Sequence, residues 1–174
     1  DRGRVRTGDA VLFFNFRTDR ARQLTEAFVS HDFQAFPRAS VPVVHFVTMT
    51  RYREDFPCSI AYPPHRLKGA LPEVVSKAGL SQLRIAETEK YAHVTFFLSG
   101  GDERELAGER RILIPSPKVA TYDMQPEMSA SLVTDALLKE VASDNCPHVT
   151  ILNFANADMV GHSGIVDAAV LAVQ

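Results

Sequence analysis

The chain has 174 residues and a formal net charge of −2, with 45% hydrophobic and 23% charged residues. This length is long for one small domain and short for two full ones. Basic residues form no run long enough for a nucleic-acid-binding arm, and no apolar run approaches the roughly 18 residues of a membrane-spanning helix. The two cysteines lack metal or disulfide spacing, and no apolar signal segment follows the basic N-terminus. We expect a cytoplasmic protein that binds neither nucleic acid nor membrane.

The first third of the sequence predicts two strands and a helix. The nearly continuous apolar run at residues 11–16 predicts a strand buried on both faces. Thr18 can cap the helix that follows, and residues 43–50 are a second strand candidate. The segment 51–67 carries charges and three prolines without periodicity, so it is interpreted as a connection. A domain boundary is expected near residues 63–68.

Strands and helices continue to alternate in the rest of the chain. A helix is predicted from Leu71, with Pro72 in its first turn and Gly79 just past its end. Residues 91–98 alternate in a way that predicts a strand. Other strands are expected at 83–86, 111–115 and 148–154, and other helices at 129–143 and 165–174. Such alternation predicts the α/β class, with a partial, mostly parallel sheet flanked by helices.

Arg17 and Arg20 lie at the start of the helix predicted after Thr18. The positive end of the helix dipole disfavours cations there, so two arginines favour an anion bound by backbone N–H groups and guanidinium groups. The ligand would be a phosphate or a carboxylate. The alternative is that Asp19 and nearby acids pair with the arginines.

Three further residues have a functional and a structural interpretation. Lys90 precedes the strand predicted at 91–98 and could reach a phosphate; the alternative is a solvated lysine beside two glutamates. His93 fits a hydrogen-bonded core histidine better than a metal ligand. Ser116 lies between two prolines without a Gly-x-Ser-x-Gly elbow, so it is not interpreted as a nucleophile.

Asp158 and His162 follow the strand predicted at 148–154, in a stretch expected to be a loop that contains Gly161. Strand ends that run into such loops are where α/β proteins place metal ligands. A carboxylate and an imidazole this close can share one divalent cation. Alternatively, Asp158 caps a turn and His162 packs on the loop. Two ligands do not complete a catalytic metal site, which takes at least three from protein.

Five stretches carry a family resemblance: residues 14–22 (FNFRTDRAR), 85–95 (IAETEKYAHVT), 114–119 (IPSPKV), 126–129 (PEMS) and 153–162 (NFANADMVGH). Together, and in this order, they resemble the cofactor-independent (2,3-bisphosphoglycerate-independent) phosphoglycerate mutases of the bacterial type. The resemblance implies an alkaline-phosphatase-like domain with two manganese ions and a nucleophilic serine, and a transferase domain inserted in it. Residues 1–65 would be the C-terminal part of the inserted transferase domain. Residues 66–174 would be the middle part of the alkaline-phosphatase-like domain.

The resemblance also implies roles for single residues. Arg17 and Arg20 would bind the phosphate or carboxylate of the substrate, and Lys90 would contact the phosphate. Asp158 and His162 would ligate one manganese ion. The implied reaction interconverts 3-phosphoglycerate and 2-phosphoglycerate in glycolysis through a phosphoserine on a metal-activated serine, without 2,3-bisphosphoglycerate. Members of the family are usually monomeric.

The chain departs from the family because it resembles only a middle portion of the longer family sequence. It lacks the nucleophilic serine and several metal ligands, so no catalytic residue is assigned. The isolated chain is expected to show no mutase activity and to bind manganese weakly or not at all. One alternative is a non-catalytic fragment or module that binds phosphoglycerate. Another is a different metal-dependent phosphatase or phosphomutase of the same superfamily.

Overall fold

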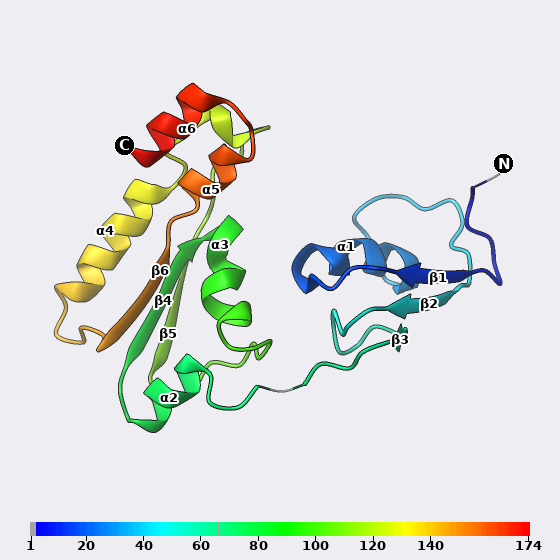
Figure 1. Ribbon diagram of the computed structural model, residues 1–174, viewed down its shortest axis with the longest axis horizontal. Coiled ribbons are helices and arrows are strands. Elements are labelled where there is room, and N and C mark those ends of the chain that lie inside the picture. The colour runs from blue at the N-terminus through cyan, green and yellow to red at the C-terminus, as the bar shows by residue number, and fades with distance from the viewer. Residues whose placement is uncertain (1–2, 66) are drawn as a thin grey trace. The chain divides into compact units, whose positions relative to one another are not determined.

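The computed structural model describes residues 3–65 and 67–174. These residues form two compact units, an N-terminal unit up to His65 and a C-terminal unit from Leu67 onward (Figure 1). Both units are α/β, and their paired strands are all parallel, which confirms the predicted fold class. None of the helices described is long and apolar enough to cross a membrane. The assignment of the units to a transferase and an alkaline-phosphatase-like domain stays a prediction.

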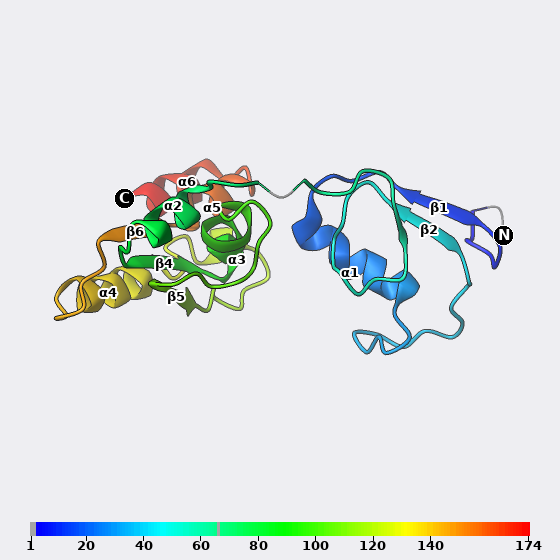
Figure 2. The ribbon, with the colours of Figure 1, turned by 90° about the horizontal axis from the view of Figure 1, so that it is seen from below.

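The N-terminal unit is built on a three-stranded sheet in the order β1-β2-β3. Its elements are β1 (Ala10–Phe13), α1 (Thr18–Val29), β2 (His45–Thr48) and β3 (Ser59–Ile60). Figure 2 shows α1 lying along one side of the strands. Ala21 of α1 packs with Tyr52 and Phe56 in a small buried cluster. The helix thus covers one face of the sheet.

Three predictions for this unit are wrong in part. The strand expected over residues 11–16 ends at Phe13, and its burial alternates because α1 packs on one face alone. Thr18 is the first residue of α1 and not its cap; Arg17 occupies the N-cap and makes no capping side-chain hydrogen bond. The segment 51–67 is not a plain connection, because it contains the short strand β3.

The C-terminal unit is built on a three-stranded sheet in the order β5-β4-β6. The strands are β4 (Gln82–Glu87), β5 (Glu109–Ile114) and β6 (Val149–Asn153). The helices are α2 (Leu71–Lys77), α3 (Thr88–Ala92), the π-helix η1 (His93–Phe97), the 3-10 helix η2 (Tyr122–Met124), α4 (Ala130–Val141), α5 (Asn156–Gly161) and α6 (Val166–Val173). The helices predicted from Leu71, Ser129 and Ile165 are therefore present as α2, α4 and α6.

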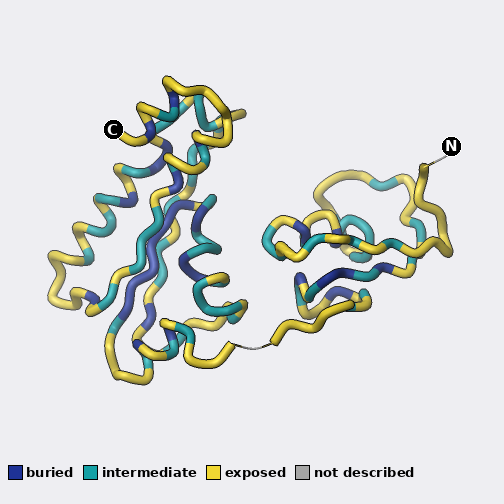
Figure 3. Tube along the Cα trace, viewed as in Figure 1, coloured by how far each residue is buried: buried dark blue, intermediate teal, exposed yellow. Residues whose placement is uncertain are grey.

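The central strand β4 is buried along its whole length (Figure 3). Successive side chains of a strand point to opposite faces. Leu83 and Ile85 are fully buried against Val133 of α4. On the other face, Nη1 of Arg84 donates a 2.7 Å hydrogen bond to the backbone carbonyl of Val94 in η1. The sheet is thus covered by α4 on one side and by α3 and η1 on the other, which explains why β4 has no polar, solvated face.

The strand predicted at residues 91–98 is absent, and this segment forms the end of α3 and η1. Val94 and Thr95 are buried, and the Thr95 hydroxyl donates a 2.7 Å hydrogen bond to the Tyr91 carbonyl four residues earlier. The segment packs as a helix against β4, where the Val94 carbonyl accepts the Arg84 guanidinium. The alternation of residues 91–98 therefore predicted the two-residue period of a strand, whereas the segment is helical.

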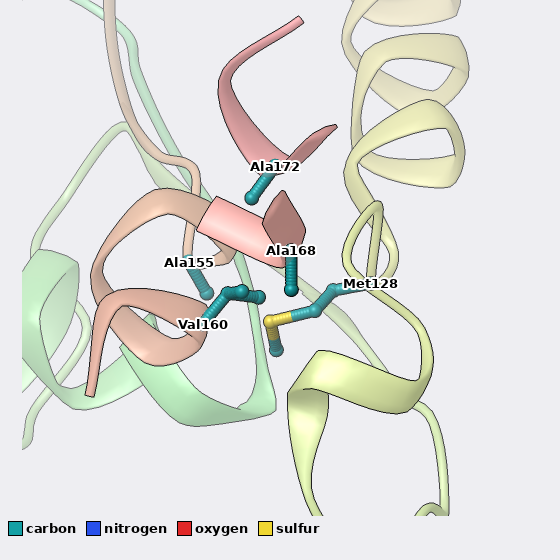
Figure 4. Close-up of a cluster of buried hydrophobic side chains, with 5 residues drawn as sticks. All are labelled: Met128, Ala155, Val160, Ala168 and Ala172. Carbon is teal, nitrogen blue, oxygen red and sulfur yellow. The ribbon is translucent and has the colours of Figure 1, made fainter. Parts of the chain in front are cut away.

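A second hydrophobic cluster holds the segments that follow β6 (Figure 4). Its buried members are Met128, Ala155, Val160, Ala168 and Ala172. The Met128 side chain points toward Val160 of α5 and Ala168 of α6, so it joins both helices to the segment before α4. This packing fixes the position of α5, which carries Asp158.

Candidate functional site

The predicted phosphate and metal residues of the C-terminal unit meet at one edge of its sheet. Lys90 lies on α3, which begins directly after β4, and Asp158 lies on α5, which begins three residues after the end of β6. The two strands are parallel neighbours, with Ala86 paired to Asn153. Their carboxyl ends therefore open on the same edge, where parallel sheets bind ligands.

Lys90, Asp158 and His162 form a contiguous charged cluster. The Lys90 ammonium bonds directly to Asp158 Oδ2. Asp158 Oδ1 lies 3.5 Å from His162 Nε2, one helical turn away. The Lys90 side chain is 11% exposed, whereas the His162 side chain is 75% exposed. The structure thus brings together three of the five residues that the sequence singled out.

The segment that carries this cluster is a helix and not the loop expected from the sequence. Residues Asn156–Gly161 form α5, with His162 as its C-cap. The His162 N–H donates to the Asp158 carbonyl at 3.2 Å, which is the bonding that places residues four apart on one face. Helical geometry therefore aligns the carboxylate with the imidazole better than a free loop would.

The Asp158 carboxylate is held in its ionised form. Its hydrogen bond with Lys90 is the largest cause that lowers the pKa of Asp158, and the charges of His162 and His93 act in the same direction. An ionised carboxylate next to an imidazole is the donor set that binds manganese, zinc or cobalt. Among the described residues no group of three or more His, Cys, Asp and Glu could hold a metal. Asp158 and His162 thus fit part of a metal site. The sequence led to the same expectation, because two ligands do not complete a catalytic site.

The alternative interpretation of Lys90 as a solvated side chain is wrong, because Lys90 is buried at 9% exposure. The prediction that His93 lies on a strand is also wrong. His93 begins η1, is half-buried and packs its ring 5.3 Å from that of Phe97. It lies three residues after Lys90 in the continuous helical segment of α3 and η1, and its charge acts to lower the pKa of Asp158.

Sequence analysis missed the carboxylate at the end of β4. Glu87 is fully buried, accepts a 2.9 Å hydrogen bond from the Ser116 hydroxyl and a 3.4 Å bond from the Ser129 N–H. Burial raises the pKa of Glu87, and these two bonds oppose that shift. Glu89 accepts a 2.8 Å hydrogen bond from the Tyr122 hydroxyl. The signal that could have pointed to Glu87 was its place directly after the strand predicted at 83–86, where an acid ends an apolar stretch.

Arg17 and Arg20 belong to the N-terminal unit and are exposed. The Arg17 side chain is 64% exposed, and its Nε lies 3.1 Å from each Asp19 oxygen. Partial burial acts to raise the pKa of Asp19, but the Arg20 backbone N–H and the Arg17 guanidinium hold it below its ordinary value. The ion pair predicted as the alternative to anion binding is therefore present for Arg17.

Comparison with known proteins first defines the superfamily to which the chain belongs. The Metalloenzyme superfamily matches residues 15–174, so the chain belongs to this superfamily. Within it, the chain is 59% identical over 98% of its length to "2,3-bisphosphoglycerate-independent phosphoglycerate mutase 1" of Methanosarcina acetivorans. It is 60% identical over 99% of its length to the 2,3-bisphosphoglycerate-independent phosphoglycerate mutase of Methanococcoides burtonii, and 56% identical over 98% to that of Acinetobacter baylyi.

The fold leads to the same proteins. A crystal structure of Leishmania mexicana phosphoglycerate mutase at low cobalt concentration matches with a TM-score of 0.88 and 35% identity. The match covers 99% of this chain and 32% of that one. The chain likewise spans 33% of each of the three curated relatives named above. The resemblance to cofactor-independent phosphoglycerate mutases is therefore confirmed, for about a third of their length.

Proposed function

We propose that the chain is the central portion of a cofactor-independent phosphoglycerate mutase, which interconverts 3-phosphoglycerate and 2-phosphoglycerate in the cytoplasm as a step of glycolysis. One observation carries the proposal. Lys90, Asp158 and His162 converge at the carboxyl edge of a parallel sheet, in a chain similar to these mutases over nearly its full length. A cation, an anion and an imidazole in contact suit the binding of a metal ion and a phosphate side by side.

In this proposal Asp158 and His162 would hold one of two manganese ions, which would lower the pKa of a nucleophilic hydroxyl and neutralise charge on the transferring oxygens. Asp158 stays ionised because Lys90 donates to it. Lys90 presents its ammonium to the phosphate from a nearly buried position, which keeps water from screening the charge.

Arg17 and Arg20 are proposed to bind the phosphate or carboxylate of phosphoglycerate. Their exposure and their position at the first turn of α1 support this role, because the positive end of a helix and two guanidinium groups favour an anion there. The substrate would displace Asp19 from Arg17. The arginines contribute by holding glycerate while its phosphoryl group is transferred.

The test uses the purified 174-residue chain and two ligands, 3-phosphoglycerate and a simple phosphate ester such as glycerol 2-phosphate. We expect no mutase turnover, and calorimetric binding of 3-phosphoglycerate that weakens in Arg17→Ala/Arg20→Ala. Turnover at enzyme-like rates would overturn the inactivity of this portion. Equal binding of both ligands by the wild type would favour a phosphatase of the same superfamily. Equal 3-phosphoglycerate binding by wild type and the double variant would remove the role of the arginines.

A further inference from the structure

The first turn of α3 is capped by a residue from a distant loop. No side chain of the N-cap residue bonds to the helix. Instead the Ser116 hydroxyl oxygen, 27 residues later in the chain, accepts the Glu89 N–H at 3.4 Å. The Ser116 N–H donates to the Thr88 hydroxyl at 3.1 Å. The loop after β5 therefore supplies the capping that α3 does not supply for itself.

The buried carboxylate of Glu87 orients this cap. The Ser116 hydroxyl donates its proton to Glu87 Oε2. The lone pairs of Ser116 Oγ are therefore left to accept the Glu89 N–H. Glu87 Oε1 accepts the Ser129 N–H, and the Ser129 hydroxyl donates to the Pro115 carbonyl at 2.8 Å. The end of β4, the loop after β5 and the start of α4 are thus joined at one carboxylate.

A carboxylate in this position carries an energetic cost that an apolar side chain would avoid. Glu87 has no exposed surface, and a buried ion is unfavourable unless hydrogen bonds replace its hydration. Packing alone would be satisfied by an apolar residue of similar volume. The charge is therefore explained by what its bonds hold in place.

What those bonds hold is the short helix that carries Lys90. Helix α3 has five residues and continues directly into the five-residue η1, and a helix of that combined length is marginal on its own. Lys90 lies three residues after Glu87, and its ammonium must cross to Asp158 on α5. A change in the direction of the first turn would move the Lys90 side chain away from that point.

We propose that Glu87 and Ser116 are positioning residues that set the direction of α3 and thereby hold the Lys90 ammonium where it meets phosphate. The proposal rests on the proposed function in one respect, the contact between Lys90 and phosphate. Neither Glu87 nor Ser116 touches the ligand. Each acts through the backbone of α3, so a change in either should weaken phosphate binding without removing the lysine.

The experiment compares Glu87→Gln and Ser116→Ala with the wild-type 174-residue chain. Gln offers one acceptor oxygen, so its amide N–H₂ replaces the acceptor of either Ser116 or Ser129, and Ala removes the cap outright. Two matched controls remove a similar bond elsewhere. Glu73→Gln changes a carboxylate that accepts the Gly69 N–H, and Thr134→Ala changes a hydroxyl that bonds within α4.

Two readouts are measured, the affinity for inorganic phosphate and the NMR resonance of the Lys90 ammonium, assigned by its loss in Lys90→Met. We expect both variants to bind phosphate about tenfold more weakly, the effect of one lost bond to a charged group, while both controls bind like the wild type. The Lys90 resonance should shift and broaden in the two variants alone. Ser116→Thr keeps the hydroxyl and should restore the affinity and the resonance.

The outcomes separate the proposal from the function on which it rests. If Lys90→Met binds phosphate as well as the wild type, Lys90 has no phosphate role, and the resonance alone then decides whether Glu87 and Ser116 position it. An unchanged Lys90 resonance in Glu87→Gln and Ser116→Ala overturns the proposal. So does a similar loss of phosphate affinity in the controls. If Glu87→Gln fails to fold, the half-buried Ser116 still gives the decision through its Ala and Thr variants.

Discussion

The two units present their charged groups in opposite ways. In the N-terminal unit, Arg17 is 64% exposed and pairs with a neighbour two residues away. In the C-terminal unit, Lys90 is 11% exposed and pairs with Asp158, which is 68 residues distant in sequence. An exposed pair is screened by water and gives way easily to a ligand, whereas a buried charge depends on its partner. The arginines are suited to capture an anion, and the lysine is suited to hold one in a fixed place.

This difference extends from the sites to the sheets beneath them. Each residue of β4 is buried, whereas β1 alternates between exposed and half-buried residues. A site on the C-terminal unit therefore stands on a strand that is covered on both faces. The substitutions below test whether the contrast in burial produces a contrast in stability and binding.

The largest expected effect is that of Arg84→Met. Arg84 is fully buried, donates to the Val94 carbonyl and to Gln82 Oε1, and lies 3.6 Å from a Glu109 oxygen. Its removal takes these hydrogen bonds from the Val94 carbonyl and Gln82 and leaves the buried Glu109 with Arg111 as its one side-chain donor among the residues described, which should cost about 4 kcal/mol of unfolding free energy, as measured by urea denaturation. Arg17→Met is the control and should cost less than about 0.5 kcal/mol. Equal effects would show that burial does not separate the two arginines.

A smaller effect is expected for Ile85→Ala at the centre of β4. Ile85 is fully buried with Leu83 and Val133, so the deletion should cost about 3 kcal/mol through lost apolar contact and the cavity left behind. Leu12→Ala in β1 is the matched control, because Leu12 is 61% exposed. It should cost less than about 1 kcal/mol. Urea unfolding monitored by circular dichroism measures both, and similar midpoints for the two variants would contradict the contrast between the sheets.

The pH dependence of stability tests the buried carboxylate. Burial raises the pKa of Glu87 above its unfolded value, so the folded chain binds the proton more tightly than the unfolded chain. Stability from this group is therefore present below the unfolded pKa and is lost as pH rises through the raised, folded pKa. Thermal unfolding of wild type and Glu87→Gln between about pH 4 and pH 8 should show the wild type losing stability relative to the variant as pH rises. A constant difference would contradict the raised pKa.

Local pattern was enough to predict the architecture of both units. Strands were expected where β1, β2, β4, β5 and β6 lie, because each of them contains a short stretch of apolar residues, whereas the two-residue strand β3 was not expected. Helix α2 was predictable from Pro72 at its start and Gly79, which has a φ of 71°, just after its end. These signals come from the residue itself and its near neighbours.

The errors lie where distant residues determine local structure. Residues 91–98 alternate like a strand, but the Arg84 guanidinium binds the Val94 carbonyl and keeps the segment helical against β4. The burial of Lys90 depends on Asp158, which no local pattern could indicate. Ser116 was considered from the sequence only as a nucleophile and not interpreted as one, and its capping of α3 needs the alignment of β4 with β5. Residue types were predictable at the candidate site, and their contacts were not.

The smallest expected change in stability, and the sharpest contrast in binding, comes from replacing one aspartate in each unit by asparagine. Asp19→Asn removes an acid that pairs with Arg17 in the first turn of α1, so stability should fall by less than about 1 kcal/mol. The same change removes a competitor for Arg17, so 3-phosphoglycerate should bind more tightly. Asp158→Asn should have the opposite effect on the metal and remove any weak cobalt binding that the chain has, because a neutral amide replaces a charged ligand.

Calorimetry with 3-phosphoglycerate and with cobalt measures both responses, and His31→Asn provides a control at an exposed position. Tighter phosphoglycerate binding by Asp19→Asn would establish that the exposed pair yields to the ligand. Unchanged or weaker binding would instead make Asp19 part of the structure that orients Arg17. In that case both units would position their charges before the ligand arrives, and the contrast between them would be one of burial alone.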